Sequence, residues 1–385
     1  MGNPFKYGKE VSGYRFYDRE GDSRKLRRRL VDGSTNIVMF APRRYGKTSL
    51  VLRVMEQVRT ANAIPGLLFD MAKVTTLPQF CESYANAVFS LFGGKAAILH
   101  RITEFLAHLH PSFSLSEGGV PTVRLDYGER MSATSISEVI DLPEKMAREL
   151  GGHPIVVAFD EFQEVAELAS DFPLEKIFRS CIQAHSLVRY VFLGSKTHLM
   201  KRMFGDHSRP FYKSALPMPL GKPPVEESLD FLVSRFAHEG IAVPIAAAEA
   251  IVAVADNIPY YIQAVASHAF EMATESRSAT LSAETVEAAA DEFVDENSDL
   301  YEAQMRHLSD AKHAAVRALA NEPTASFNEE YRRRHSLPTY STLHSAVREL
   351  IDDGTIESDD AGYRLGDPMF ARYVRRSPAR IFALE

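Results

Sequence analysis

The chain has 385 residues, of which 45% are hydrophobic and 25% charged, and its formal net charge is −7. The length predicts two or three domains, and the ordinary composition argues against an intrinsically disordered chain. The acidic balance excludes a protein that coats nucleic acid over its whole surface, and the lack of a long apolar run or signal-peptide core predicts a cytoplasmic protein without a membrane span.

Short apolar runs alternate with helical stretches in the first part of the chain. After a basic, helix-like run at residues 23–30, five apolar runs have the length and composition of buried parallel strands. They cover residues 37–41, 66–71, 155–159, 190–194 and 215–220. The alternation predicts an α/β fold with a doubly wound parallel sheet, interrupted by an insertion at about 93–140 that contains a candidate exposed strand at 118–127.

The first predicted strand runs directly into a phosphate-binding loop and a helix. The loop pattern G-x-x-x-x-G-K-[ST] is matched by Gly46, Lys47 and Thr48, whereas Ala41 replaces its first glycine. In this pattern backbone N–H groups and a helix N-terminus hold the phosphates, the lysine reaches the terminal phosphates and the hydroxyl binds Mg²⁺. The sequence therefore predicts a nucleoside triphosphate site, with an ordinary strand–helix turn as the alternative. Because alanine disfavours positive φ, the loop must be pre-set by neighbours such as Pro42.

The third predicted strand, residues 155–159, ends in two adjacent acids, Asp160 and Glu161. This order matches a Walker B element, in which the first acid enters the Mg²⁺ shell and the second polarises the attacking water. Thr48 and Asp160 are thus the predicted metal ligands, and Lys47, Asp160 and Glu161 are predicted catalytic residues. The alternative is a strand that simply ends in solvated acids.

Two further catalytic roles are expected beyond the fourth strand. Ser195 follows the strand at 190–194 and is expected to sense the γ-phosphate, with a turn-forming serine as the alternative. Arg209 or Lys213 is expected to act as a finger across a subunit boundary, which implies a nucleotide-dependent homo-oligomer. A surface cation in a loop is the alternative for each.

Strand signals disappear after residue 224, and helical periodicity continues to residue 301. A third segment then contains a helix at 311–320, a stretch at 331–334, a capped helix ending in a turn at Gly354 and a hairpin with its turn at 359–362. This order is typical of a winged helix-turn-helix. The predicted domains are a P-loop core at 1–223, a helical lid at 224–304 and a winged helix at 305–385.

Charge is distributed unevenly over these domains. Acidic residues are in excess between 226 and 302, where Arg235 and Arg277 are the only basic residues, whereas basic clusters lie at 332–334 and 372–380. Any nucleic-acid contact is therefore expected on the winged helix or the P-loop core. Polar side chains on the helix at 339–350 favour DNA binding, while Asp359 and Asp360 at the wing tip favour a protein contact or autoinhibitory packing.

With these motifs in place, the chain resembles the archaeal-type ATPase family of the STAND branch of P-loop NTPases, which are close to AAA+ proteins. The resemblance spans nearly the whole chain and rests chiefly on residues 42–49 and 159–163, with supporting marks at 16–20, 194–195, 211–212, 258–263 and 362–370. It implies a nucleotide-binding αβα core, a helical lid and a C-terminal winged helix, with ATP or ADP and Mg²⁺ as cofactors. The implied nucleotide-binding residues are Arg19, Glu20, Pro42, Arg43, Arg44, Tyr45, Gly46, Lys47, Thr48, Ser49 and Pro259.

The leading function is a Mg²⁺-dependent ATPase switch, in which nucleotide binding between core and lid repositions the winged helix toward DNA or a protein partner. Two departures from the family bear on turnover: Ala41 replaces the usual first glycine, and Lys213-Ser214 stand where many relatives carry a glycine–arginine pair, which leaves Arg209 as the substitute finger. One alternative is a nucleotide-gated scaffold in signalling or defence with little turnover. A small-molecule kinase is another, which the paired acids and the winged helix disfavour. ATP is preferred over GTP only through the family resemblance.

Overall fold

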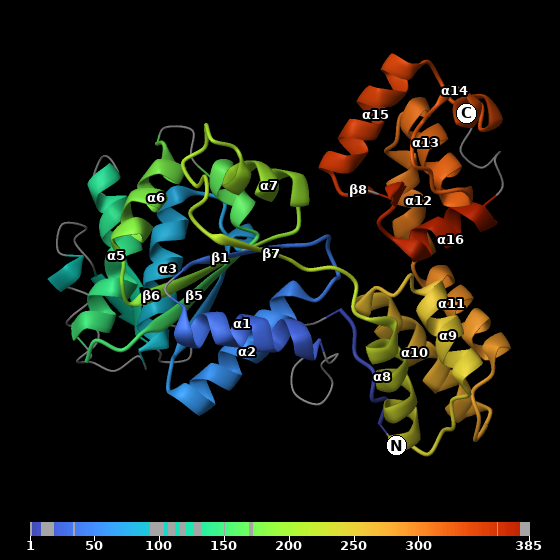
Figure 1. Cartoon of the computed structure of the whole chain (residues 1–385), viewed down its shortest axis with the longest axis horizontal. Coiled ribbons are helices and arrows are strands. Elements are labelled where there is room, and N and C mark those ends of the chain that lie inside the picture. The colour runs from blue at the N-terminus through green and yellow to red at the C-terminus, as the bar shows by residue number, and fades with distance from the viewer. Residues whose placement is uncertain are drawn as a thin grey trace. The chain divides into compact units, whose positions relative to one another are not determined.

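The computed structural model describes residues 2–8, 19–33, 35–92, 104–106, 112–115, 121–125, 132–149, 151–168, 172–359 and 361–377. Within these residues the chain forms two compact units (Figure 1). The core unit consists of Glu20–Ala41 and Lys47–Leu220, and the C-terminal unit consists of Met1–Arg19, Pro42–Gly46 and Gly221–Glu385. Five residues of the phosphate loop thus belong to the C-terminal unit. The three domain ranges expected from the sequence stay predictions.

A five-stranded sheet forms the centre of the core unit. Its strands are β1 (Ile37–Phe40), β2 (Gly66–Asp70), β5 (Ile155–Asp160), β6 (Val188–Gly194) and β7 (Leu216–Pro219). They lie in the order β2-β5-β6-β1-β7, and every neighbouring pair is parallel. All five predicted strands are therefore confirmed. This order places the carboxyl ends of β1, β5 and β6, which carry the predicted site residues, along one edge of the sheet.

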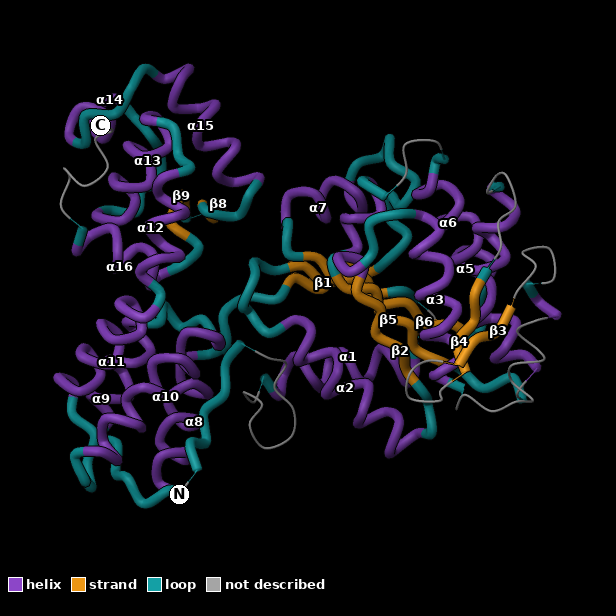
Figure 2. Tube along the Cα trace, turned by 180° about the vertical axis from the view of Figure 1, so that it is seen from behind, coloured by secondary structure: helices purple, strands orange, loops and turns teal. Residues whose placement is uncertain are grey.

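Helices cover both faces of this sheet. α1 (Glu20–Asp32) and α2 (Lys47–Asn62) lie on one face, and α3 (Leu77–Leu91), α5 (Ala133–Glu149) and α6 (Leu174–Ala184) lie on the other (Figure 1, Figure 2). Because helices cover both faces, every residue of β5 is buried and β1 and β6 are buried along most of their length, which explains why these central strands appear in the sequence as continuous apolar runs. The predicted α/β class with its αβα layers is confirmed.

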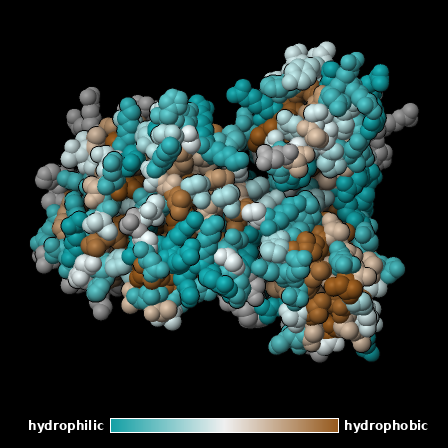
Figure 3. All heavy atoms as spheres, viewed as in Figure 1, coloured by the Kyte–Doolittle hydropathy of each residue, from teal (hydrophilic) through white to brown (hydrophobic). Residues whose placement is uncertain are grey.

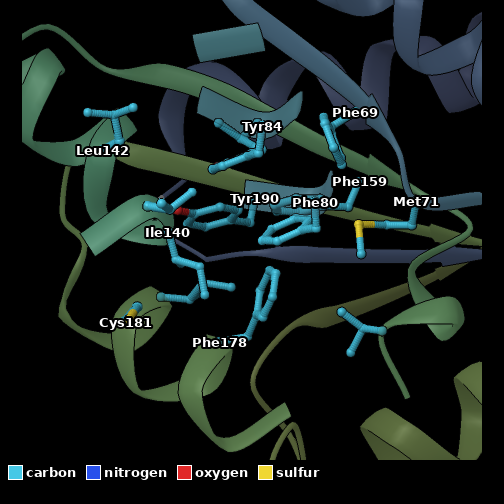
Figure 4. Packing of buried hydrophobic residues seen from close by; sticks show 14 of the residues in the cluster. Phe69, Met71, Phe80, Tyr84, Ile140, Leu142, Phe159, Phe178, Cys181 and Tyr190 are labelled. Carbon is cyan, nitrogen blue, oxygen red and sulfur yellow. The ribbon is translucent and has the colours of Figure 1, made fainter. Parts of the chain in front are cut away.

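An aromatic cluster holds the strand that ends at the predicted acids. Phe159 of β5 is fully buried, and its ring centroid lies 5.5 Å from that of Tyr84 on α3 and 5.7 Å from that of Phe178 on α6. The rings of Phe69 on β2 and Tyr190 on β6 lie 6.2 and 6.1 Å away (Figure 4). Ring pairs of this kind add to the stabilisation that burial alone provides. The cluster therefore fixes the end of β5 and the acid that follows Phe159.

Part of the predicted insertion is described. Its strands β3 (Ser112–Leu115) and β4 (Pro121–Arg124) pair antiparallel, and β4 falls within the stretch expected as an exposed strand. Val123 of β4 is buried, and the Asn86 side chain of α3 accepts a hydrogen bond of 2.7 Å from its N–H and donates one of 2.8 Å to its carbonyl oxygen. Residues 118–120 and 126–127 of that stretch lie outside the described residues.

The first part of the C-terminal unit is helical, as predicted. Its helices are α8 (Val225–His238), α9 (Ile245–Val254), α10 (Pro259–Glu275), α11 (Ala283–Glu296) and α12 (Ser298–Arg306), which we call the lid. α10 is buried along most of its length and contacts α9 and α11. Apolar atoms gather on the viewed face of the lid in Figure 3, and its exposed large apolar side chains include Val225, Val233 and Ile245. Among the described helices, none combines the length and the apolar character needed to cross a bilayer.

Residues 2–8, which we call the N-terminal strap, pack against the lid. The side chain of Phe5 is only 3% exposed, and its ring centroid lies 4.7 Å from that of Phe236 and 6.0 Å from that of Phe231. Asn3 Nδ2 donates a hydrogen bond of 2.8 Å to Ser267 Oγ on α10. The strap thus contributes an apolar side chain to the interior of a domain that lies more than 200 positions further along the chain.

The predicted winged helix is present. Its elements are α13 (Asp310–Asn321), α14 (Glu329–Arg334), α15 (Tyr340–Asp352), β8 (Ile356–Asp359), β9 (Gly362–Leu365) and α16 (Pro368–Arg376). β8 and β9 form the expected antiparallel hairpin, and Thr324 pairs with Tyr363 at its other edge. α15 ends before Gly354, whose φ is 85°, so this glycine makes the expected turn. α16 is an element that the sequence analysis did not anticipate.

Arginines of α16 pair with an acidic row on α11. Arg372 contacts Glu287 and Asp291, each at 2.8 Å, and Arg376 contacts Asp295 at 2.8 Å. These pairs join the acid-rich lid to the basic end of the winged helix. Arg372 and Arg376 were expected to be available to nucleic acid, but they are engaged within the protein. Residues 378–380 of the same basic cluster lie outside the described residues.

Candidate nucleotide site

The two predicted metal ligands lie together at the edge of the sheet. Thr48, at the start of α2, donates a hydrogen bond of 2.6 Å from Oγ1 to Asp160 Oδ2 at the end of β5. Asp160 is 9% exposed, and burial raises the pKa of its carboxyl, against the opposing effect of the Thr48 hydrogen bond. A hydroxyl and a carboxylate that are 112 positions apart in the sequence thus lie within hydrogen-bond distance of each other.

These ligands fit a magnesium ion by their chemistry. Mg²⁺ prefers oxygen donors and is commonly held by one or two protein oxygens together with substrate phosphates and water. A hydroxyl and a buried carboxylate within hydrogen-bond distance of each other supply such a pair. Among the described residues there is no cluster of three or more His, Cys, Asp or Glu side chains able to hold a metal.

The phosphate loop achieves its turn without a glycine at its first position. Lys47 is buried, and its Nζ donates a hydrogen bond of 2.8 Å to the Ala41 carbonyl oxygen. Among the loop residues, positive φ occurs at Arg44, at 70°, and at Gly46, at 85°. Glycine is therefore required by the backbone at Gly46 and not at Ala41, so the departure noted in the sequence leaves this loop conformation unstrained at its start.

Glu161 is held by the tips of two neighbouring strands. Its Oε2 accepts hydrogen bonds from the Ser195 N–H, at 3.1 Å, from Ser195 Oγ, at 2.7 Å, and from Gln163 Nε2. Burial would raise the pKa of Glu161, but the hydrogen bonds from Gln163 and Ser195 hold that pKa below its ordinary value. Its φ of 49° is left-handed, a strained backbone of the kind that clusters at functional sites. An ionised, oriented carboxylate results.

Gln163 is a site residue that sequence reasoning did not assign. It was recognised as part of the motif at 159–163, but no role was derived for it. The structure places its amide against the carboxylate of Glu161. Its position in the short helix η4 (Phe162–Ala166), directly after the paired acids, is the signal that could have identified it.

Arg19, Glu20 and Pro259 are the residues expected to border the base of the nucleotide. Arg19 is buried, and its Nη2 donates hydrogen bonds to the carbonyl oxygens of Tyr45, at 3.0 Å, and Gly221, at 2.8 Å. Glu20 is exposed at the start of α1, and Pro259 is the buried first residue of α10. Arg19 thus holds the phosphate loop at Tyr45, while its nucleotide contact, like those of Glu20 and Pro259, stays a prediction.

The remaining loop residues differ in their surroundings. Arg43 is exposed, Pro42 and Ser49 are half-buried, and the side chains of Arg44 and Tyr45 contact the winged helix.

The candidate finger is engaged within its own core unit. Arg209 forms an ion pair with Glu175 on α6, and the two side chains are 29% and 13% exposed. Lys213 is exposed, and its Nζ lies 5.1 Å from the ring centroid of Tyr212. A role for either cation at the γ-phosphate of another subunit stays a prediction.

Comparisons with known proteins agree with this architecture. A family model described as "Probable winged helix domain" matches residues 299–376. A Walker-type ATPase of Pyrococcus abyssi has a similar structure, with a TM-score of 0.65 and 20% identity over 97% of this chain and 99% of that one. No curated protein matches the sequence significantly.

Two ORC proteins of Aeropyrum pernix are also similar in structure. ORC2, described as ADPNP–ADP complexes, gives a TM-score of 0.59 with 16% identity over 97% of this chain and 96% of that one. ORC1, described in complex with DNA, gives 0.50 with 15% identity over 96% and 94%. Membership of the STAND branch stays a prediction. From these similarities we conclude that the chain has the P-loop ATPase fold of these archaeal proteins, followed by a C-terminal winged-helix domain.

Proposed function

We propose that the protein binds and hydrolyses ATP and that its nucleotide state sets the position of the lid and the winged helix. The observation that carries this proposal is the meeting of Thr48 and Asp160 beside Lys47 and Glu161 at one edge of the sheet. The architecture shared with a Walker-type ATPase and with ORC2 in complex with ADPNP and ADP supports ATP as the nucleotide.

Each residue has a distinct task in this proposal. Lys47 would exchange the Ala41 carbonyl oxygen for phosphate oxygens, and the ionised Glu161 would accept a hydrogen bond from the attacking water. Ser195 and Gln163 keep that carboxylate oriented. Mg²⁺, when held by Thr48 and Asp160, would neutralise charge on the transferred phosphate.

Replacing Lys47 with alanine is expected to lower ATP affinity by about tenfold to 100-fold, because a charge-assisted hydrogen bond to phosphate contributes roughly 1.5–3 kcal/mol. Titration calorimetry with ATP and Mg²⁺ measures the affinity. Lys25→Ala, at an exposed position of α1, is the matched control and should bind ATP as the unchanged protein does. Equal affinity in Lys47→Ala would show that the loop is not the phosphate site.

DNA is the partner that we propose for the winged helix. The outer face of α15 carries an exposed aromatic residue, Tyr340, which is 62% exposed, and several exposed polar side chains. The latter are Ser341, Thr342, His344, Ser345 and Arg348. The DNA complex of the ORC1 neighbour supports this assignment. The acidic wing weighs against it less than the sequence suggested, because Asp359 is paired with Arg364 at 2.6 Å.

A duplex-binding titration over a range of salt concentrations tests this partner. Arg348→Ala should lower the slope of log affinity against log salt by about one, since one phosphate contact is lost. Arg235→Ala, on α8 of the lid and outside the winged helix, should leave the slope unchanged. Absence of duplex binding even at low salt would rule out DNA and leave a protein as the partner of the winged helix.

A nucleotide-gated scaffold with little turnover is the second candidate function. The ion pair between Arg209 and Glu175 favours it, because that arginine is held away from a role in stabilising charge on phosphate. The two functions predict different rates of phosphate release and the same affinity for ATP.

A further inference from the structure

A single side chain of the phosphate loop contacts both the lid and the winged helix. Arg44 Nη1 donates to Asp367 Oδ2 at 2.6 Å, in the turn between β9 and α16. The guanidinium carbon of Arg44 also lies 4.9 and 5.0 Å from the ring centroids of Tyr260 and Tyr261, at the start of α10. Both distances are within the range of cation–π attraction. All of these residues belong to the C-terminal unit.

The carboxylate that receives Arg44 is oriented by its own helix. Asp367 Oδ1 accepts hydrogen bonds of 2.9 Å from the N–H groups of Met369 and Phe370, which makes it the N-cap of α16. Its side chain is 19% exposed. Because Oδ1 is committed to the helix, Oδ2 is presented to the loop, where Arg44 holds a left-handed φ of 70°. A strained non-glycine residue persists only where its surroundings hold it, and this ion pair is one such restraint.

The next loop residue makes a second contact with the wing. The hydroxyl of Tyr45 donates a hydrogen bond of 3.1 Å to Glu357 Oε2 on β8, and Glu357 is paired with Arg364 of β9 at 2.8 Å. Tyr45 is buried, and burial together with the nearby Glu357 carboxylate raises the pKa of its phenol, so that the hydroxyl remains a donor. Arg44 and Tyr45 therefore reach α16 and the wing with adjacent side chains.

We propose that Arg44 and Asp367 form a coupling contact through which the phosphate loop acts directly on the winged helix. This inference rests on the proposed function and adds a route that does not pass through the lid. When phosphates enter, Lys47 has to leave the Ala41 carbonyl oxygen, and the loop backbone between Ala41 and Lys47 carries Arg44. A change in that backbone alters the position of the guanidinium and so the contact at the start of α16.

Asp367→Asn is the sharpest test, because it removes one charge and keeps the cap. The asparagine oxygen can still accept from Met369 and Phe370, whereas its amide group cannot accept from Arg44. Hydrogen exchange across residues 356–370, measured with and without ATP and Mg²⁺, should change on nucleotide binding in the unchanged protein. That change should be lost in Asp367→Asn and in Arg44→Ala.

The double variant and a matched control separate coupling from general damage. If the two side chains act as one contact, Arg44→Ala combined with Asp367→Asn should behave as either single variant does. Asp353 accepts a hydrogen bond of 2.8 Å from the Thr355 N–H, and an asparagine at this position can still accept it. Asp353→Asn should therefore keep the nucleotide-dependent change in hydrogen exchange.

ATP binding is titrated on the same samples, so the two proposals fail differently. Absence of binding in the unchanged protein would refute the proposed function. Binding with no change at 356–370, or a change of full size in Asp367→Asn, would overturn the coupling contact.

Discussion

Glu161→Gln is expected to lower the rate of ATP hydrolysis by about 100-fold or more, because a positioned general base contributes roughly 100-fold to 10,000-fold. The glutamine oxygen can take the place of Glu161 Oε2 and accept from Ser195 and Gln163, so the local structure should be retained. ATP affinity should therefore change little. Phosphate release measures the rate, and a parallel calorimetric titration measures binding.

Glu167→Gln is the matched control for this substitution. Glu167 lies just beyond η4, is 63% exposed and is 3.5 Å from Lys196, so the loss of its charge should leave hydrolysis unchanged. Hydrolysis by Glu161→Gln at the rate of the unchanged protein would exclude Glu161 as the base. An unchanged protein that binds ATP and releases no phosphate would instead favour the scaffold.

Phe159→Ala is expected to destabilise the core unit by about 3–5 kcal/mol, the usual cost of truncating a buried phenylalanine. Its ring is fully buried and packed against rings from α3, α6 and both neighbouring strands. Because the chain has two units, a probe specific to one of them is needed. The thiols of Cys81 and Cys181 are both buried in the core unit, so their reactivity in increasing urea reports its unfolding.

Phe159→Leu provides the graded comparison, since it keeps most of the buried volume and should cost less than the alanine variant. Phe5→Ala, in the N-terminal strap, should weaken the lid and leave the thiol transition in place. If Phe159→Ala exposed the two thiols at the same urea concentration as the unchanged protein, the aromatic cluster would not be what holds the core unit.

The sequence predicted the central strands of the sheet well because burial on both faces leaves a direct trace in the chain. The five strands are continuous apolar runs, and the edge strand β7 was recognisable despite its prolines, Pro217 and Pro219. The phosphate loop and the paired acids were recognisable because each is a local pattern on a predicted element. Thr48 follows β1 and Asp160 ends β5, and the carboxyl ends of parallel strands lie along one edge of the sheet. Their proximity could therefore be predicted once the strands were taken to be parallel.

Contacts between distant loops could not be predicted in this way. Arg44 and Asp367 are separated by 323 positions, and neither lies in a periodic pattern that identifies its partner. The pairing of α16 with α11 had a weak trace in the opposed charges of the two segments, but charge alone does not give register. The packing of the N-terminal strap on the lid left no trace in the sequence. A single phenylalanine in a short segment does not indicate which part of the protein buries it.

The strap also sets an order of events during synthesis. Phe5 emerges first, yet the rings that enclose it, Phe231, Phe236 and Phe270, are translated more than 200 residues later. At about 5–20 residues per second, this delay is roughly 10–50 s. The strap therefore stays without its partner rings while all five strands of the sheet are made, because β7 ends 12 positions before Phe231.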